Sequence, residues 1–450
     1  MKKIYFLLLW ALVIPGFAAE TVKGDLASFL GEYRLASGGW ITFTRMGVID
    51  AMAQPLFVDW ESGRYGQIMA VGTDRFVSPS AAKPDSPWQS ELLFRRDDSG
   101  RVTGLTLTEK GEKPRTAERA EPWTDKEVAF PSAEISLAAT LRLPQGKGLF
   151  PAVVLVHGSG PGARSQLVVM AAFFARLGMA VLWYDKRGCG GSGGDWKKVD
   201  LETLAADAVA GATWLRSRPG IDRKRIGIWG ISQGGWITPL AGSLDPELAF
   251  VINSSGPGTS LRRQDTYMMA NVLKAGKIKE EDAQLYLKML GTLYEYGRGK
   301  ASAAALDELS EQVRANADLK DMALPPAKDI TPAALYAKQA IGDPAWFYHL
   351  DPDRDALAPY RKLRCPLLVT YGKLDMTIPV EESVRLINET LRSAAHPDFN
   401  VEVLPTAGHG FAMMKEGEPP APVQPGRLAR EFFSVIENWL RCRGFCAGAK

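Results

Sequence analysis

The residues with the clearest chemical meaning are Gly230-Ile231-Ser232-Gln233-Gly234-Gly235. They follow a strand-like run at 225–229 and precede an apolar run of helical character. Small residues around a serine allow a sharp strand-to-helix turn that exposes the hydroxyl group at the end of the strand. The alternative is a glycine-rich helix start in which Ser232 is only the N-cap residue. We favour the first interpretation and expect Ser232 to be a nucleophile.

A serine hydroxyl is a weak nucleophile, so a base must take its proton. The chain has four histidines, and His409 is the best placed, because it follows a strand-like run at 401–404 on a loop flanked by glycines. His157 ends an apolar strand and is expected to organise the loop that follows. His349 and His396 are expected to lie at the surface or in packing contacts.

A third residue should orient the imidazole and stabilise its charged form. Asp375 suits this role, because it comes just after the buried run at 367–371. The carboxylates of Asp351, Asp353 and Asp355 precede that run, and we expect them to cap or anchor the returning chain. The predicted catalytic residues are therefore Ser232, Asp375 and His409.

Attack on a carbonyl creates an oxyanion, which needs backbone donors already in place. The N–H of Gln233 is one candidate, since it directly follows the nucleophile. The loop after the first apolar strand supplies the second, with Ser159 N–H preferred and Gly158 as its rival. His157 and Gly158 are expected to support this loop.

Strands that alternate with amphipathic helices after Pro122 indicate a mostly parallel sheet with helices on both faces. The interval 261–346 breaks this alternation, because it contains helical stretches and no strand signal. We expect it to be a helical lid over the carboxyl ends of the strands, and its alternative is a purely structural excursion. The strand-like runs lie at 151–156, 180–184, 225–229, 367–371 and 401–404.

The preceding region, 24–121, has short strand-like runs separated by Gly, Pro, Ser and Asp, and lacks helical periodicity. This pattern predicts a small antiparallel β-domain. It resembles small β-domains that are appended to bacterial hydrolases and β-lactamase-like proteins. The catalytic domain is then expected at 122–445.

Four motifs in order carry a wider resemblance. From about residue 125 to 441 the chain resembles an α/β-hydrolase, and within that superfamily it resembles bacterial esterases near the prolyl oligopeptidase and acyl-thioester hydrolase groups. The chain order Ser232, Asp375, His409 is also the α/β-hydrolase order. The resemblance implies serine acyl hydrolysis without a cofactor. The motifs are His157-Gly158-Ser159-Gly160-Pro161, Tyr184-Asp185-Lys186-Arg187-Gly188 through Ser192, Gly230-Ile231-Ser232-Gln233-Gly234-Gly235 and Gly408-His409-Gly410-Phe411.

The second motif has a structural interpretation, in which Asp185-Lys186-Arg187 is an ion-paired turn that supports the nucleophile. Its glycines resemble a phosphate cradle, but no Lys-Ser/Thr ending of a P-loop follows. The 54 Lys and Arg residues nearly balance the 51 Asp and Glu residues of this 450-residue chain, so there is no general electrostatic case for nucleic acid. No metal site is predicted.

The chain begins with Met1-Lys2-Lys3, then an apolar run from Ile4 to Phe17, then small residues. This is the pattern of a secretory signal peptide at 1–18, and it predicts a periplasmic or extracellular protein with no membrane span after cleavage. An uncleaved anchor is the alternative, but the run is shorter than a spanning helix needs.

Four cysteines, Cys189, Cys365, Cys442 and Cys446, would then meet an oxidising compartment. A turn at Gly444 could close a Cys442–Cys446 disulfide, which we prefer to a zinc site.

The leading hypothesis is an exported serine carboxylesterase that acts on a small ester. A peptidase would have the same triad and would need acidic groups to bind a peptide terminus. The candidates for these groups are Glu280, Glu281 and Asp282, whose alternative role is a solvated helix start. A thioesterase is a further alternative.

A hypothesis of another class is a non-catalytic protein that binds a polymer through its β-domain. Trp40, Trp60 and Trp88 are the candidate contacts with the polymer. Their alternative role is to fill the core of the β-domain or its contact with the catalytic domain.

Overall fold

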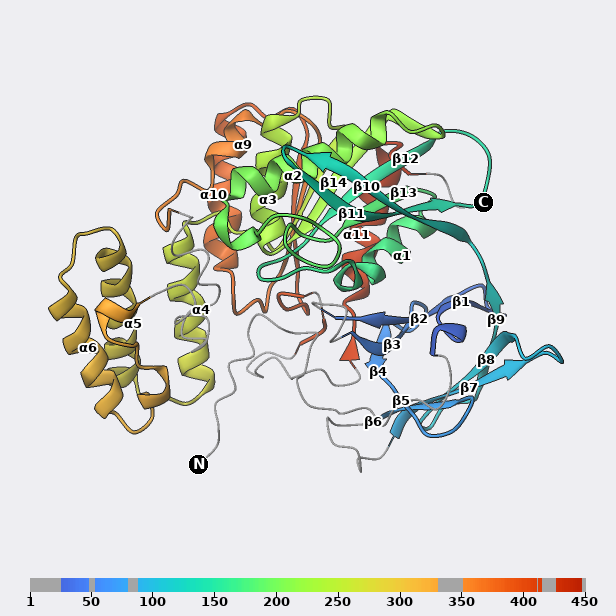
Figure 1. The fold of residues 1–450 in the computed structure, drawn as a ribbon, viewed down its shortest axis with the longest axis horizontal. Coiled ribbons are helices and arrows are strands. Elements are labelled where there is room, and N and C mark those ends of the chain that lie inside the picture. The colour runs from blue at the N-terminus through green and yellow to red at the C-terminus, as the bar shows by residue number, and fades with distance from the viewer. Residues whose placement is uncertain are drawn as a thin grey trace.

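A computed structural model describes residues 26–47, 53–79, 88–330, 351–410, 412–414 and 426–446. The expected signal peptide at 1–18, His349 and the last part of the expected lid, 331–346, lie outside the described residues. Figure 1 shows an α/β body, with an antiparallel sheet and a group of helices both on its lower side.

The α/β body is built on an eight-stranded sheet with the order β10-β11-β13-β12-β14-β15-β16-β17. Its first strands pair antiparallel, and the pairs from β13 onward along this order are parallel. Every residue of β13, β15 and β16 is buried, because helices cover both faces of the sheet. The strands are β10 (Trp123–Ser132), β11 (Ile135–Pro144), β12 (Phe150–Val156), β13 (Ala180–Tyr184), β14 (Ile221–Ile231), β15 (Phe250–Ser254), β16 (Leu367–Gly372) and β17 (Phe399–Leu404).

Two layers of helices bury this sheet. Helices α1 and α11 share one apolar cluster with the sheet, and α2 and α3 share another cluster with its other face. Helices α9 and α10 pack near β16 on the face that α2 and α3 cover. The helices are α1 (Val168–Arg176), α2 (Leu201–Arg216), α3 (Gln233–Leu244), α9 (Ala358–Lys362), α10 (Val380–Ser393) and α11 (Arg430–Cys442), and short 3-10 turns lie at Leu26–Ser28, Arg164–Gln166, Trp196–Lys198, Lys320–Met322 and Ala327–Asp329.

The N-terminal region forms a ten-stranded antiparallel sheet in the order β18-β4-β3-β2-β1-β9-β8-β7-β6-β5. Its core is rich in aromatic side chains, with Phe76 edge-on to Phe43 and Phe94 at centroid distances of 5.4 Å. One strand, β18, comes from the far end of the chain. The strands are β1 (Gly31–Leu35), β2 (Trp40–Met46), β3 (Gln54–Asp59), β4 (Arg64–Gln67), β5 (Met69–Ala70), β6 (Arg75–Pro79), β7 (Trp88–Arg96), β8 (Val102–Glu109), β9 (Arg115–Ala120) and β18 (Gly426–Arg427).

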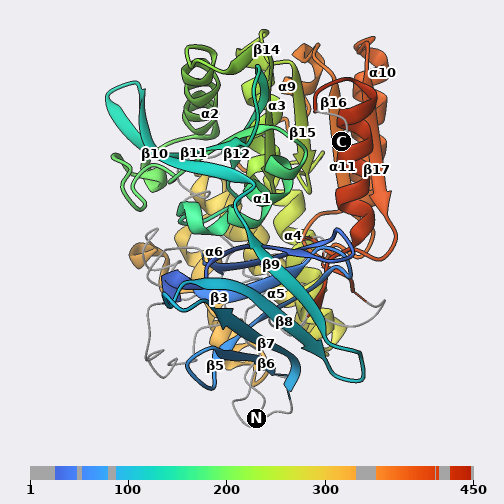
Figure 2. The ribbon, with the colours of Figure 1, turned by 90° about the vertical axis from the view of Figure 1, so that its right-hand side faces the viewer.

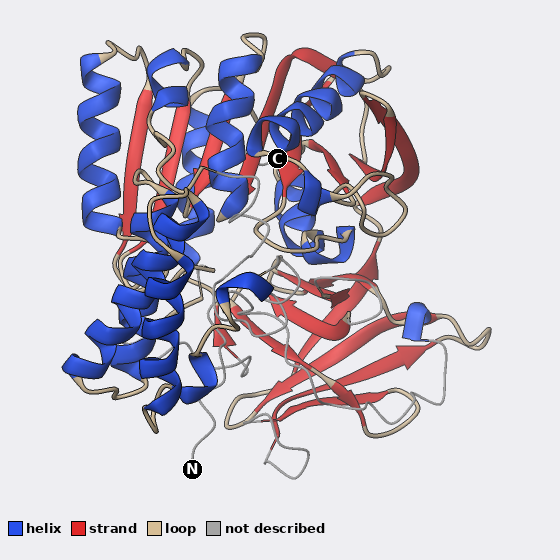
Figure 3. Ribbon diagram, turned by 60° about the vertical axis from the view of Figure 1, so that its left-hand side comes forward, coloured by secondary structure: helices blue, strands red, loops and turns tan. Residues whose placement is uncertain are grey.

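The insertion after β15 is helical, as its sequence predicts. It contains α4 (Leu261–Ala275), α5 (Glu280–Gly297) and α6 (Ala303–Ala315), which share an apolar core of their own that is separate from the sheet. Ser260 and Ser302 cap α4 and α6 by accepting hydrogen bonds from backbone N–H groups. Figure 3 shows these helices beside the antiparallel sheet, below the α/β body.

A buried ion pair joins the β-domain to the α/β body, which lies above it in Figure 2. Arg176 of α1 pairs with Glu32 and donates to Thr42 Oγ1 at 2.6 Å. Trp60 stacks on this guanidinium at 4.4 Å and packs edge-on against Phe433 of α11. Trp60 therefore serves the domain contact, the alternative role considered for it above.

The expected Cys442–Cys446 disulfide is wrong, since all four cysteines of the chain are free. Gly444 adopts a φ of +70° and ends α11, and the N–H of Phe445 turns back to donate to Leu440 O at 2.9 Å. This turn directs Cys446 into the apolar cluster on the sheet, while Cys442 stays exposed on the helix. Burial raises the pKa of the Cys446 thiol, which makes it less reactive.

Candidate active site

Ser232 lies at the turn between β14 and α3, and its backbone is strained. Its φ of 57° and ψ of −113° lie in a region that non-glycine residues rarely adopt. The backbone N–H of Ser232 donates to Ser254 O at 2.9 Å, which ties the turn to the neighbouring strand β15. Ser232 is 9% exposed. The structure thus has the strained turn that the sequence motif predicts for a nucleophile.

Close backbone contacts explain the glycines around this turn. A Cβ at Gly230 would lie 2.5 Å from Gly234 O, and one at Gly234 would lie 2.7 Å from Val156 O. A Cβ at Gly235 would lie 2.4 Å from Gly256 Cα. The first turn of α3 therefore packs backbone against backbone, which holds the serine at the end of the sheet.

We expect Gly235→Ala to lower the free energy of unfolding by about 2 kcal/mol or more, because the added methyl group meets fixed backbone. Gly291→Ala is the matched control, since a Cβ there meets nothing within 4 Å in the middle of α5. The control should raise stability by about 0.5–1 kcal/mol through helix propensity. Urea unfolding followed by circular dichroism measures both. Equal stability of the two variants would contradict the close packing described here.

Asp375 and His409 are brought together from two different strand ends. Asp375 follows β16, His409 follows β17, and Nδ1 of His409 lies 2.8 Å from Oδ2 of Asp375. The other oxygen, Oδ1, accepts hydrogen bonds from the N–H groups of Thr377 and Ile378 at 2.7 and 3.0 Å. These two bonds fix the orientation of the carboxylate, which is fully buried.

The second ring nitrogen of His409 is unused. Nε2 is buried and has no hydrogen-bond partner among the described residues, so no hydrogen bond joins it to Ser232 in this structure. Catalytic hydrogen bonds are often long in enzymes without substrate. Ser255, which directly follows β15, donates its hydroxyl to His409 O at 3.0 Å and anchors the histidine backbone.

The loop after β12 lies directly against Ser232. A Cβ at Gly158 would lie 3.6 Å from Cβ of Ser232, so the loop borders the serine at Gly158. Gln233 is the first residue of α3, and its N–H therefore has no acceptor within the helix. The arrangement places both predicted donor segments beside Ser232.

Lys186 links these two segments, a role that sequence reasoning missed. Its buried ammonium group donates to Gly158 O at 2.7 Å, to Gly160 O at 2.8 Å and to Oε1 of Gln233 at 2.8 Å. The flanking residues form the expected ion-paired turn, with Arg187 bound to Asp207 at 2.6 Å. The position of Lys186 at a strand end was visible in the sequence, but the direction of its side chain was not.

The helical insertion is anchored at the loop that carries Asp375. Tyr267 of α4 donates to Asp375 O at 3.3 Å, and Asn271 donates to Met376 O at 3.0 Å. Among the rival carboxylates, Asp353 pairs with Arg262 at 2.7 Å.

Asp355 accepts from Arg361 and from Leu357 N–H. These aspartates anchor the returning chain instead of meeting His409.

The other described histidines have structural environments. His396 is buried, its ring is edge-on to Phe399, and its Nδ1 accepts from Asp398 N–H at 3.3 Å. His157 is buried at the end of β12, with its ring edge-on to Tyr184. Burial, together with the charge of Lys186, lowers the pKa of His157 to about 3.

This shift predicts a pH-dependent stability. The folded pKa of His157 lies below the unfolded value of 6.5, so its stabilising contribution is present above pH 6.5 and is lost as the pH falls toward 3. We expect the wild type to lose about 2 kcal/mol more than His157→Gln between pH 7 and pH 5. Urea unfolding at both pH values measures this difference. Parallel losses in the two proteins would show that His157 titrates normally.

Within the described part of the chain, no group of three or more His, Cys, Asp or Glu side chains is arranged to hold a metal ion. The helices that the structure describes include none with the length and apolar character needed to cross a membrane.

Comparison with protein families identifies the family of this chain. The model of the X-Pro dipeptidyl-peptidase (S15) family matches residues 133–395, more than half of the sequence. The chain belongs to the S15 family. The S15 match includes Ser232 and Asp375 and ends before His409.

Among curated relatives, the esterase EstD of Thermotoga maritima is 23% identical over 368 residues, which cover 77% of this chain and 76% of EstD. An uncharacterised 31.7 kDa protein of Escherichia coli is 26% identical over 159 residues, 35% of this chain and 52% of that protein. The quorum-quenching protein AidA of Acinetobacter baumannii is 32% identical over 133 residues, 29% of this chain and 44% of AidA. The chain thus spans about half the length of the last two relatives.

Among solved structures, an esterase of Pyrococcus furiosus is 19% identical, with a TM-score of 0.45 over 71% of this chain and 91% of that one. The S15 match and the EstD relationship confirm the predicted resemblance to α/β-hydrolase serine hydrolases of the bacterial esterase type.

Proposed function

We propose that this protein hydrolyses carboxylic esters through an acyl-enzyme intermediate on Ser232. The observation that carries the proposal is the strained Ser232 at the β14–α3 turn, at the same edge of the sheet as the hydrogen-bonded pair of His409 and Asp375. In the proposed reaction Ser232 attacks the ester carbonyl, and His409 accepts the hydroxyl proton and then gives it to the leaving alcohol. Water, activated by the same histidine, releases the acid.

The negative charge on the tetrahedral intermediate needs donors on one side of the substrate carbon. We assign this role to the backbone N–H groups of Gln233 and Ser159. Lys186 supports both segments through the carbonyl oxygens of Gly158 and Gly160 and the side chain of Gln233. Its positive charge lies within hydrogen-bonding distance of both segments, which favours a developing anion.

The second candidate function is peptide cleavage. Membership of the S15 family favours it, because the description of that family names X-Pro dipeptidyl-peptidase. Such a peptidase must bind the amino terminus of its substrate. The acidic group at 280–282 lies on the first turn of α5, where Glu280 accepts from Gln284 and Asp282 accepts from Asn316. These contacts support the interpretation as a solvated helix start, so we rank the esterase first. Thioester cleavage by the same triad is a smaller alternative.

The two functions are separated by parallel assays of the purified protein. The panel compares p-nitrophenyl acetate, butyrate and octanoate with aminoacyl and X-Pro p-nitroanilides, each also measured with Ser232→Ala. We expect ester turnover that the variant lacks, and no anilide cleavage. Anilide cleavage that depends on Ser232 would assign the protein to the peptidases, and absence of any Ser232-dependent turnover would favour the non-catalytic alternative.

We also propose that the protein is exported and that its leader is removed after Ala18. The motif at 1–18 supports this proposal. N-terminal sequencing of the periplasmic or secreted protein should begin at Ala19, and an unprocessed N-terminus would contradict it.

Contact of the β-domain with a polymer stays a prediction. Of the candidate contacts Trp40, Trp60 and Trp88, the most accessible is Trp88, which is 37% exposed on β7.

A further inference from the structure

Residues 412–414, which come shortly after His409, are hydrogen-bonded to residues 427–428 at the edge of the N-terminal sheet. Around the histidine, Gly408 N–H donates to Ala412 O at 3.0 Å and Met414 N–H donates to Thr406 O at 2.8 Å, which closes a short loop. Met413 N–H then donates to Arg427 O at 2.7 Å. The loop of His409 is therefore hydrogen-bonded to the segment that carries β18.

That segment is held by the β-domain. Leu428 N–H donates to Gly63 O at 2.8 Å, and β18 pairs antiparallel with β4, with Arg427 opposite Arg64. Ala412 and Leu428 are themselves paired in an isolated bridge. A continuous set of backbone hydrogen bonds thus runs from the loop of His409 to the turn at Gly63.

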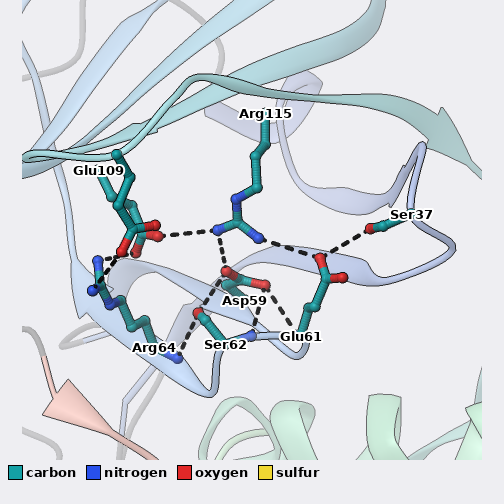
Figure 4. A network of polar contacts seen from close by, with 8 residues as sticks. Ser37, Asp59, Glu61, Ser62, Arg64, Glu109 and Arg115 are labelled. Atoms are coloured by element: carbon teal, nitrogen blue, oxygen red, sulfur yellow. Dashed lines mark hydrogen bonds and ion pairs between the residues drawn. The ribbon is translucent and has the colours of Figure 1, made fainter.

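A buried network of charges shapes this turn. Asp59 is fully buried, accepts from Glu61 N–H at 3.0 Å and from the Ser62 hydroxyl at 2.6 Å, and its backbone carbonyl accepts from Gly63 N–H. Figure 4 shows Arg115 of β9 between the carboxylates of Asp59, Glu61 and Glu109.

Arg64 binds Glu109 from the other side at 2.7 Å. Ion pairs with side chains of β8 and β9 therefore hold the turn to which the segment after His409 is hydrogen-bonded.

An apolar cluster supports the same contact. Met46, Leu56, Val58 and Tyr65 of the β-domain pack together, and Ala412 and Leu428 of the histidine segment pack against them. Val168 and Val169 of α1 complete the cluster from the α/β body. Side chains from the β-domain, from α1 and from the segments after His409 therefore meet in one cluster. Ala412, a member of this cluster, lies three residues after His409 in the sequence.

We propose that the β-domain is a positioning element for His409, and that Asp59 is its key positioning residue. The proposal rests on the assignment of His409 as the base of the proposed hydrolase. The β-domain holds the loop of His409 through the backbone hydrogen bonds and the apolar cluster described above. Asp375 and Ser255 hold the histidine itself from the α/β body. Small displacements of a catalytic group cost large factors in rate, about a hundredfold for 1 Å.

The test uses the full-length protein and compares Asp59→Asn with Asp97→Asn. Both aspartates cap a turn in the β-domain through their side chains, since Asp97 accepts from the N–H groups of Ser99 and Arg101 at 3.0 Å. Asp97 lies between β7 and β8, at the opposite end of β8 from Glu109, and far from β18 in the order of the sheet. The pair therefore matches the chemical change and differs in its connection to His409.

We expect Asp59→Asn to lower kcat for a p-nitrophenyl ester by between about tenfold and a hundredfold at unchanged KM. Asp97→Asn should stay within about twofold of the wild type. Hydrogen exchange of a peptide covering 404–414 should be faster in Asp59→Asn alone. If Asp59→Asn does not fold, Val58→Ala, which trims the shared apolar cluster, replaces it with the same expected direction.

Unchanged kcat and unchanged exchange at 404–414 in a folded Asp59 or Val58 variant would overturn the proposal. Equal losses in Asp59→Asn and Asp97→Asn would also overturn it, because they would show general destabilisation of the domain. A wild type without Ser232-dependent turnover would instead refute the proposed function. In that case faster exchange at 404–414 in Asp59→Asn would still support the structural link.

Discussion

Replacing Ser232 with alanine is expected to lower kcat for p-nitrophenyl esters by about four to six orders of magnitude. The variant lacks the only atom that the proposed mechanism bonds to the acyl group. Alanine also suits the surroundings of residue 232, since it adds no atoms beyond the serine Cβ. Stopped assays with concentrated enzyme, together with mass spectrometry for the acyl-enzyme, measure the loss.

Ser243→Ala is the matched control for this experiment. Ser243 lies at the far end of the same helix, α3, and its hydroxyl donates to Leu240 O at 2.7 Å. We expect its kcat to remain within about twofold of the wild type, because the change removes one partly buried helix hydrogen bond. Retention of ester turnover by Ser232→Ala would remove Ser232 from the mechanism.

Replacing Asp375 with asparagine is expected to lower kcat by about four orders of magnitude. The N–H groups of Thr377 and Ile378 both point at Oδ1, so they will hold the amide oxygen of asparagine in that position. The amide NH2 group then faces Nδ1 of His409 and requires it to accept a hydrogen bond. The proton moves to Nε2, and the histidine can no longer take the proton of Ser232.

This result is measured by the pH dependence of kcat, with Asp355→Asn as the control. Asp355 also accepts a backbone N–H in a turn, but it pairs with Arg361 and has no contact with His409 among the described residues. The control should keep its activity within about twofold. A loss of less than tenfold in Asp375→Asn would mean that another group orients the imidazole.

The candidate site follows from local patterns because each of its parts is local. A serine between small residues after a strand has few conformations available, and the strained φ of Ser232 is the one that the motif predicts. Asp375 and His409 each come a few residues after a strand of a parallel sheet, and the carboxyl ends of parallel strands lie at one edge. Their contact therefore follows from the alternation of strands and helices.

The features that the sequence did not reveal depend on contacts between distant segments. Strand β18 has two residues, too few for any periodicity, and it forms because β4 offers a free edge. The three hydrogen bonds of Lys186 depend on two loops that only the folded sheet brings together. The direction of Cys446 depends on the apolar face next to α11, so the spacing of two cysteines could not determine it.

The C-terminal origin of β18 also sets an order of assembly. During synthesis, β1 to β9 are made long before residues 426–427, so the N-terminal sheet is completed only when the last part of the chain has been made. Until then the edge of β4 has no partner from β18, and the loop of His409 has no attachment to Gly63. His409, the proposed catalytic base, is therefore among the last groups of the protein to reach its final place, and a chain cut short before residue 426 keeps an open sheet edge.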